Sequence, residues 1–255
     1  MSTTNSGGPS NIPTHLTPSQ LRRLEDYLEN KCLELTRGVR KRNEPDTPYK
    51  TLSAYVAATS SLVTMILLIP PAKSSASIRT AWLLRITGDI FENIPAYSLG
   101  TVATSPPRSP NDQADQNEQE HPPPQPMLSE EGLATLEEVF CLLEKLDAGW
   151  CAIIRNERWD STVNQGIFEE SSTAGDQSNV ESNQAFSVTD STRLRSIIVS
   201  GKDEFDDWLV EQGGGDNFDI VDRSVRVMSH ALEEIGQNMP VPIQPGASDS
   251  EDDFS

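Results

Sequence analysis

The chain has 255 residues, of which 35% are hydrophobic and only 6% aromatic, and its formal net charge at pH 7 is −19. This composition excludes a chain that packs around one core along its whole length, because such a core needs more apolar side chains. Residues 1–100 have a net charge of +3 and residues 101–255 a net charge of −22. This balance argues against direct binding to nucleic acid and favours basic protein partners.

Four segments lack the apolar periodicity that a packed element needs, and we expect them to be disordered. They are a lead (1–16), a Pro-rich linker (100–127), an acidic loop (161–189) and an acidic tail (237–255). The remaining segments, 17–99, 128–160 and 190–236, are predicted to supply the helices of one bundle.

The first predicted helix begins at Thr17 as N-cap, with Pro18 at the first helical position, where a missing N–H costs nothing. Its apolar residues recur at helical intervals: Leu21, Leu24, Leu28, Leu35 and Val39. The basic run "RGVRKR" follows several acidic residues of the same helix. We therefore interpret it as an exposed face with ion pairs rather than a phosphate-binding patch.

The stretch Thr51–Ile69 carries no charge and is long enough to span a bilayer. Three polar residues, Thr59, Ser60 and Ser61, lie at its midpoint, where a spanning helix should be most apolar. The pattern favours a core helix at the hub of the bundle, followed by a turn at Pro70 and Pro71. A membrane-anchoring helix is the alternative.

Three further helices follow in chain order. The segment from Ser75 to Tyr97 should bury one face and stop at Pro95; that face is Ile78, Trp82, Ile86 and Ile90. Ser129 should cap the next helix, whose apolar stripe is Leu133, Leu136, Phe140, Leu143, Trp150 and Ile154. A fifth helix is predicted from about Ser191 to Gln212. The tryptophans are interpreted as core residues.

After "GGGD", apolar residues alternate steps of three and four without interruption, which is the strongest amphipathic pattern in the chain. They are Phe218, Val221, Val225, Met228, Leu232 and Ile235. No strand pattern competes with these helices. The predicted fold class is therefore all-α, a bundle of about six helices with long disordered loops and an acidic disordered tail.

The sequence offers no pattern typical of a catalytic, metal or cofactor site. His15, His121 and His230 are isolated from one another and from Cys32, Cys141 and Cys151, which form no C-x-x-C pair. Gly201-Lys202 lacks the preceding glycine and strand of a phosphate loop, and is interpreted as a turn in a helical face. We expect a protein that is not an enzyme, with no cofactor and no small-molecule substrate.

Candidate phosphorylation sites lie in the segments expected to be disordered. Ser105 and Ser109 each precede a proline, and Ser248 and Ser250 each have an acidic residue three positions later. These are formats that proline-directed and acidophilic kinases read. Phosphate at these serines would favour docking on an Arg/Lys cluster.

Three pieces, "RTAWLLRITGDIFENIPAY", "LDAGWCAIIRNERWD" and "TRLRSIIVSGKDEFDDWL", resemble a group of filamentous-fungal helical proteins associated with a meiotic recombination label. The resemblance covers the helices, about half of the chain. It implies an accessory role in recombination, because the phosphate loop of a recombinase is missing.

The sequence therefore favours a noncatalytic helical adaptor or subunit of a larger assembly, with a basic or helical protein partner. The unpaired cysteines and the lack of an N-x-S/T sequon or signal segment indicate the cytoplasm or nucleus. An accessory factor for chromosome or meiotic recombination processes, and a protein anchored to a membrane by residues 51–69, are the alternatives.

Overall fold

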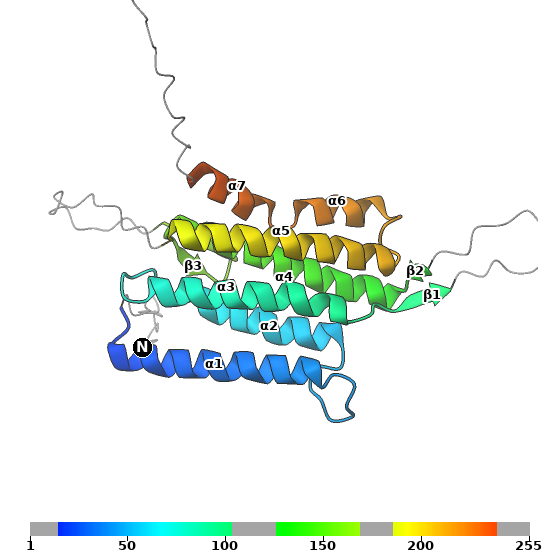
Figure 1. Ribbon diagram of the computed structural model, residues 1–255, viewed down its shortest axis with the longest axis horizontal. Coiled ribbons are helices and arrows are strands. Elements are labelled where there is room, and N and C mark those ends of the chain that lie inside the picture. Colours follow the sequence, from blue (N-terminus) through cyan, green and yellow to red (C-terminus); the bar gives the residue numbers. More distant parts are fainter. Residues whose placement is uncertain (1–14, 104–125, 169–185, 239–255) are drawn as a thin grey trace, which may run out of the picture.

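The computed structural model describes residues 15–103, 126–168 and 186–238, and this part of the chain is an all-α bundle (Figure 1). Its helices are α1 (Pro18–Arg40), α2 (Leu52–Leu67), α3 (Ala76–Asn93), α4 (Glu130–Ile154), α5 (Val188–Glu211), α6 (Phe218–Arg226) and α7 (Ser229–Asn238), with a short 3₁₀ turn, η1 (Ile94–Ala96). Two antiparallel hairpins accompany them: β1 (Thr101–Ala103) with β2 (Pro126–Leu128), and β3 (Arg158–Asp160) with β4 (Gln165–Ile167). The predicted fold class is confirmed.

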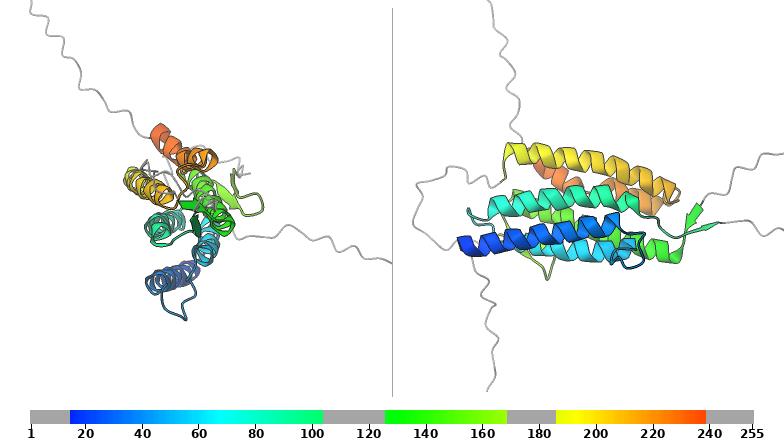
Figure 2. Two further views of the ribbon diagram at one scale, coloured as in Figure 1. Left: turned by 90° about the vertical axis from the view of Figure 1, so that its right-hand side faces the viewer. Right: turned by 60° about the horizontal axis from the view of Figure 1, so that its bottom comes forward.

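The helices stack in layers, which the end-on view of Figure 2 shows from one side to the other. α1 covers α2 and α3; α2 packs on α4, α3 packs on α5, and α7 closes the far side over α4 and α5. One connected hydrophobic core runs through these layers. The bundle therefore has two outer layers, α1 on one side and α6 with α7 on the other.

α2 is a core helix, as its sequence favours. It buries eight residues, Leu52, Tyr55, Val56, Thr59, Leu62, Val63, Ile66 and Leu67. Two of the three hydroxyl groups at its midpoint make hydrogen bonds: Ser61 donates to the carbonyl of Ala57 at 3.0 Å, and Ser60 accepts from Lys145 of α4 at 2.7 Å. In the described part of the chain, no helix has both the length and the hydropathy that a membrane crossing requires.

The expectation that α2 is the hub needs refinement, because α4 is at least as central. α4 lies against α2, α7 and the β3–β4 hairpin, and it buries Trp150 completely, with the indole N–H donating to Thr87 at 3.0 Å. Trp208 of α5 is also buried and donates to the carbonyl of Tyr97 at 2.8 Å. Trp150, Trp208 and Trp159 are core residues, as expected.

Gly201 lies inside α5 rather than in a turn, and its role is steric. A Cβ at this position would come within 2.3 Å of the Phe91 ring of α3. The glycine therefore permits the close approach of α3 and α5, which explains its presence in a helix interior where glycine is otherwise unfavourable.

The prediction for the buried face of α3 is confirmed in its second half and only in part in its first half. Ile86 and Ile90 are buried, but Ile78 and Trp82 are only half-buried, and the face includes Leu83. Leu133 of α4, placed in its predicted stripe, is 43% exposed. Both errors follow from extending one straight stripe along a helix that meets different neighbours along its length.

The structure contains hairpins that the sequence analysis did not predict. β3 and β4 lie partly in the segment 161–189 and are held by the buried Trp159 and by a tight turn. In that turn the carboxylate of Asp160 accepts the backbone N–H of Thr162 at 2.8 Å, and Asn164 adopts φ 52°. Aspartate and asparagine favour such turns, and each strand is too short to show a period.

α5 begins at Val188, earlier than predicted, because Ser187 caps it by accepting the N–H of Asp190 at 3.1 Å. The predicted last helix, from Phe218 onward, is two helices, α6 and α7, and not one. The break falls at Val227–Met228, where Met228 adopts φ 58°. This kink shapes the surface on which the candidate sites lie.

Candidate functional site

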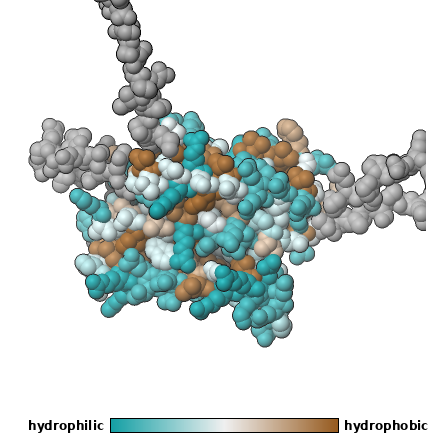
Figure 3. Space-filling model, in the orientation of Figure 1, coloured by the Kyte–Doolittle hydropathy of each residue, from teal (hydrophilic) through white to brown (hydrophobic). Residues whose placement is uncertain are grey.

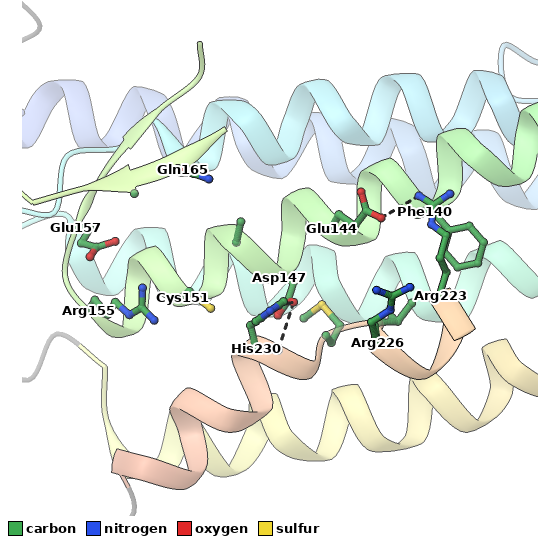
Figure 4. A pocket seen from close by; sticks show the side chains of 14 residues that line it. Phe140, Glu144, Asp147, Cys151, Arg155, Glu157, Gln165, Arg223, Arg226 and His230 are labelled. Atoms are coloured by element: carbon green, nitrogen blue, oxygen red, sulfur yellow. Dashed lines mark hydrogen bonds and ion pairs between the residues drawn. The ribbon is translucent and has the colours of Figure 1, made fainter. Parts of the chain in front are cut away.

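A groove of about 800 Å³ opens beside the kink, between α4, the link from α6 to α7, and the β3–β4 hairpin (Figure 4). Its floor is largely apolar and its rim is charged. The lining residues are Phe140, Glu144, Asp147, Ala148, Cys151, Arg155, Glu157, Gln165, Gly166, Arg223, Arg226, Val227, Met228 and His230.

Asp147 is the one buried carboxylate of this groove, with 5% of its surface exposed. Its two oxygens accept the backbone N–H groups of His230, at 3.3 Å, and Ala231, at 2.7 Å, in the first turn of α7. Met228, which precedes α7, has no side-chain acceptor to offer. Asp147 therefore caps α7 from the neighbouring helix, which satisfies donors that would otherwise be unpaired.

His230 lies beside this carboxylate, with its Nδ1 2.8 Å from Asp147 Oδ2 (Figure 4). Its side chain is 76% exposed. In the sequence His230 is isolated, and only the fold brings it to Asp147, 83 positions earlier in the chain. A histidine next to a carboxylate is a component of many catalytic sites, but here the carboxylate already serves as a helix cap.

Arg223 extends from α6 across the rim of the groove to α4. Its guanidinium lies 4.5 Å from the centre of the Phe140 ring, pairs with Glu144 at 2.8 Å and also pairs with Glu137. These hydrogen bonds raise the pKa of Arg223 above its ordinary range and lower the pKa of Glu137. The contact ties α6 to α4 by charge rather than by apolar packing.

The other arginines of the rim also have carboxylate partners. Arg155 pairs with Glu234, and Arg226 pairs with Asp222. Their guanidinium groups are at least half exposed, so each pair contributes little to stability. The rim is therefore a set of ion pairs.

Cys151 lies at the floor of the groove as a neutral thiol. Burial raises its pKa to about 12, and the nearby Asp147 adds to the shift. A thiol reacts as the thiolate, so Cys151 is a poor nucleophile at neutral pH. Within the described residues, no group of three His, Cys, Asp or Glu side chains is arranged to hold a metal ion.

A second feature, the outward face of α6, is apolar. Phe218 is 81% exposed, Val225 63% and Val221 38%, whereas only Ile220 and Ser224 of this helix are buried. We call these three exposed residues the α6 stripe. Figure 3 shows hydrophobic atoms gathered over α6 beside hydrophilic surface.

The α6 stripe contradicts the prediction that Phe218, Val221 and Val225 face the core. In the second half of the same pattern, Met228 and Ile235 do face the core and are fully buried. The kink at Met228 turns the two halves in different directions, so that α7 covers α4 while the stripe of α6 faces away from the bundle.

The four serines proposed for phosphorylation, Ser105, Ser109, Ser248 and Ser250, lie outside the described residues, as does His121. The basic run at the end of α1 is largely exposed, and its helix carries a Lys31–Glu34 pair at 2.7 Å, with a Lys41–Glu44 pair just beyond. The expected exposure of this run is therefore observed, but within the described residues only Lys41 of the run has an ion pair, and the spacing is three residues rather than four.

Arg79 is a buried residue that the sequence analysis missed. It is 2% exposed, donates from Nη1 to the carbonyl of Glu157 at 2.9 Å, and its burial lowers its pKa to about 10. It lies in the first turns of α3 and reaches the chain just after α4, so it links these two ends. Arg79 lies on the same buried side of α3 as Thr80 and Leu83. This placement on the helix is the one feature of the sequence that could have indicated its burial.

Searches against family models, curated proteins and solved structures found no match to this chain.

Proposed function

We propose that the protein is a noncatalytic helical adaptor, or a subunit of a larger assembly, that binds a partner protein through the α6 stripe. The observation that supports this is the orientation of α6. Three of its four large apolar side chains, Phe218, Val221 and Val225, point away from the core, and only Ile220 is buried. Clustered exposed apolar residues with a polar border are typical of interaction sites.

The packing of α6 supports the same proposal. A nine-residue helix is too short to be stable in water by itself, and α6 buries only Ile220 and Ser224. Burial of the stripe by a partner would remove apolar surface from water, at about 25 cal/mol per Å². The apolar face of α6 would therefore be buried only if a partner covered the outer side of the helix.

The groove supports a structural role. Its buried carboxylate, Asp147, caps α7, and its arginines are engaged by Glu137, Glu144, Glu234 and Asp222. These contacts fix the link between α6 and α7 and so hold the stripe in its outward orientation. The cysteine at the floor is neutral at physiological pH. The three free cysteines suit a reducing compartment, so we place the adaptor in the cytoplasm or nucleus.

The test is affinity purification of the full chain from cells that express it, followed by mass spectrometry. A double variant, Phe218→Ser with Val225→Ser, removes the stripe. A matched control, Val188→Ser with Val199→Ser, changes two valines of α5 that are 54% and 48% exposed. We expect a stoichiometric partner with the unchanged chain and the control, and its loss with the α6 variant. Retention by the α6 variant would refute the assignment.

A further inference from the structure

We infer that the α6 stripe binds an amphipathic α-helix of a partner protein whose apolar face is bordered by Lys and Arg. This inference rests on the proposed function and names the chemistry of the partner. It follows from the spacing of the stripe, the charge of the surface beside it and the ion pairs of Lys202, Arg223 and Arg226.

The stripe has the geometry of a helix–helix contact. Phe218, Val221 and Val225 recur at steps of three and four and lie on one side of α6. Residues with this spacing form the ridges that fit between the side chains of a second helix. A strand would instead need alternate residues and a free sheet edge.

Carboxylates without partners lie along the neighbouring surface. α5 runs beside α6, because Lys202 of α5 donates to the carbonyl of Ser224 at 2.7 Å. From α5 to the start of α6, six exposed acidic residues make no ion pair within the described chain. They are Asp203, Glu204, Asp207, Glu211, Asp216 and Asp219.

The cations of α6 and of the second half of α5 are already neutralised, whereas Arg193 and Arg195 lie nearer the start of α5. Lys202 pairs with Asp206 at 2.8 Å, Arg226 pairs with Asp222, and Arg223 pairs with the two glutamates of α4. The surface beside the stripe is therefore strongly negative. A partner helix with basic flanks would find unpaired carboxylates at the start of α6 and on the exposed side of α5, which favours association and register.

The same charge argues against a second copy of this chain as the occupant. Two stripes brought together would also bring two sets of unpaired carboxylates together, and like charges facing each other oppose the contact. An anionic lipid surface would be repelled for the same reason. A basic helix is the occupant that satisfies both the apolar and the charged parts of this surface.

Designed peptides test this chemistry directly. The probe is a fluorescent 18-residue Leu/Lys peptide with leucines at steps of three and four. One control is a Leu/Glu peptide with the same spacing of leucines. The other is a Leu/Lys peptide of the same composition in which the leucines alternate with other residues. Fluorescence anisotropy with the full chain should show saturable binding of the first peptide, at least about tenfold tighter than either control. Equal binding of the alternating peptide would overturn the inference.

Two variants separate the apolar from the charged contribution. Phe218→Ser with Val225→Ser should weaken the Leu/Lys peptide about tenfold or more with every carboxylate retained. A triple variant that neutralises three carboxylates, Asp203→Asn, Asp207→Asn and Glu211→Gln, should also weaken peptide binding. The expected loss of affinity is about threefold or more at 0.1 M salt, and less at 0.5 M salt. The matched control neutralises Glu25, Asp26 and Glu29 of α1 and should leave binding unchanged.

The outcomes are distinguishable from those of the proposed function. If the α6 variant loses its cellular partner but the Leu/Lys peptide does not bind, the partner chemistry is wrong and the docking face stands. If the carboxylate variant binds as well as the control variant, the charged contribution is wrong. Concentration-dependent dimerisation that the α6 variant abolishes would identify a second copy as the occupant and overturn the inference.

Discussion

α6 and α7 continue one amphipathic sequence pattern, but the apolar face of α7 is buried and that of α6 is exposed. The steps of three and four run from Phe218 to Ile235 without interruption, yet Met228 and Ile235 are fully buried while Phe218 and Val225 are 81% and 63% exposed. The difference begins at Met228, whose φ of 58° ends α6 and allows α7 to start in a new direction. An amphipathic pattern therefore predicts that a face will be covered, but not that the same chain covers it.

The two helices are also held by different forces. α7 buries apolar side chains against α4 and receives a carboxylate cap from Asp147. α6 buries one large apolar side chain, Ile220, and is otherwise attached through polar contacts, from Arg223 to Glu144 and from Lys202 to the carbonyl of Ser224. Variants can test this contrast between a helix whose apolar face is buried and one whose apolar face is exposed.

The largest effect is expected in the core between α4 and α3. Trp150→Ala removes a fully buried indole and its hydrogen bond to Thr87, which should lower the free energy of unfolding by about 3 to 5 kcal/mol. Urea unfolding followed by circular dichroism measures this. Trp150→Phe should cost less, because most of the volume remains; a cost for Trp150→Ala below about 1 kcal/mol would contradict the described core.

The contrast itself is tested by truncating one residue on each helix. Ile235→Ala on α7 should lower the free energy of unfolding by about 2 to 4 kcal/mol, since it leaves a cavity. Phe218→Ala on α6 should change it by no more than about 0.5 kcal/mol, because the ring is already in water. Equal costs would show that the stripe is packed within the chain.

The capping carboxylate should have an intermediate effect. Asp147→Ala leaves the N–H groups of His230 and Ala231 without their acceptor, at a cost of about 1 to 3 kcal/mol. Asp147→Asn keeps one acceptor oxygen and should cost less. Hydrogen exchange should show faster exchange in α7 than in α2 for the Ala variant, and uniform acceleration would contradict a local capping role.

The ionisation of the cysteines should have the smallest effect on stability at neutral pH, but it should make stability depend on pH above that. Burial raises the pKa of Cys32 to about 11 and that of Cys151 to about 12, from an ordinary value of 9.0. Both thiols therefore retain protons in the folded state that they lose on unfolding, so stability should fall as pH rises above about 9. At pH 7.5, alkylation with mass spectrometry should modify the exposed Cys141 first. Faster labelling of Cys151 would contradict its burial.

Most of the bundle could be predicted because its signals are local. Each signal acts within a few residues: the caps at Thr17 and Ser129, Pro95 just beyond the end of α3, and the hydroxyl-rich midpoint of α2. The candidate sites could not be predicted from the sequence, because they depend on contacts between residues that are distant in the chain. Asp147 and His230 meet only in the fold, and the break at Met228 interrupts a pattern that reads as continuous.

Hydrogen exchange on the complex recovered from cells tests the central claim most directly. The amides of α6, Phe218–Arg226, should exchange rapidly in the protein alone and become protected when the partner is bound, while α1 on the opposite side of the bundle stays unchanged. Protection confined to α1, with none in α6, would contradict the claim that the α6 stripe is the docking face.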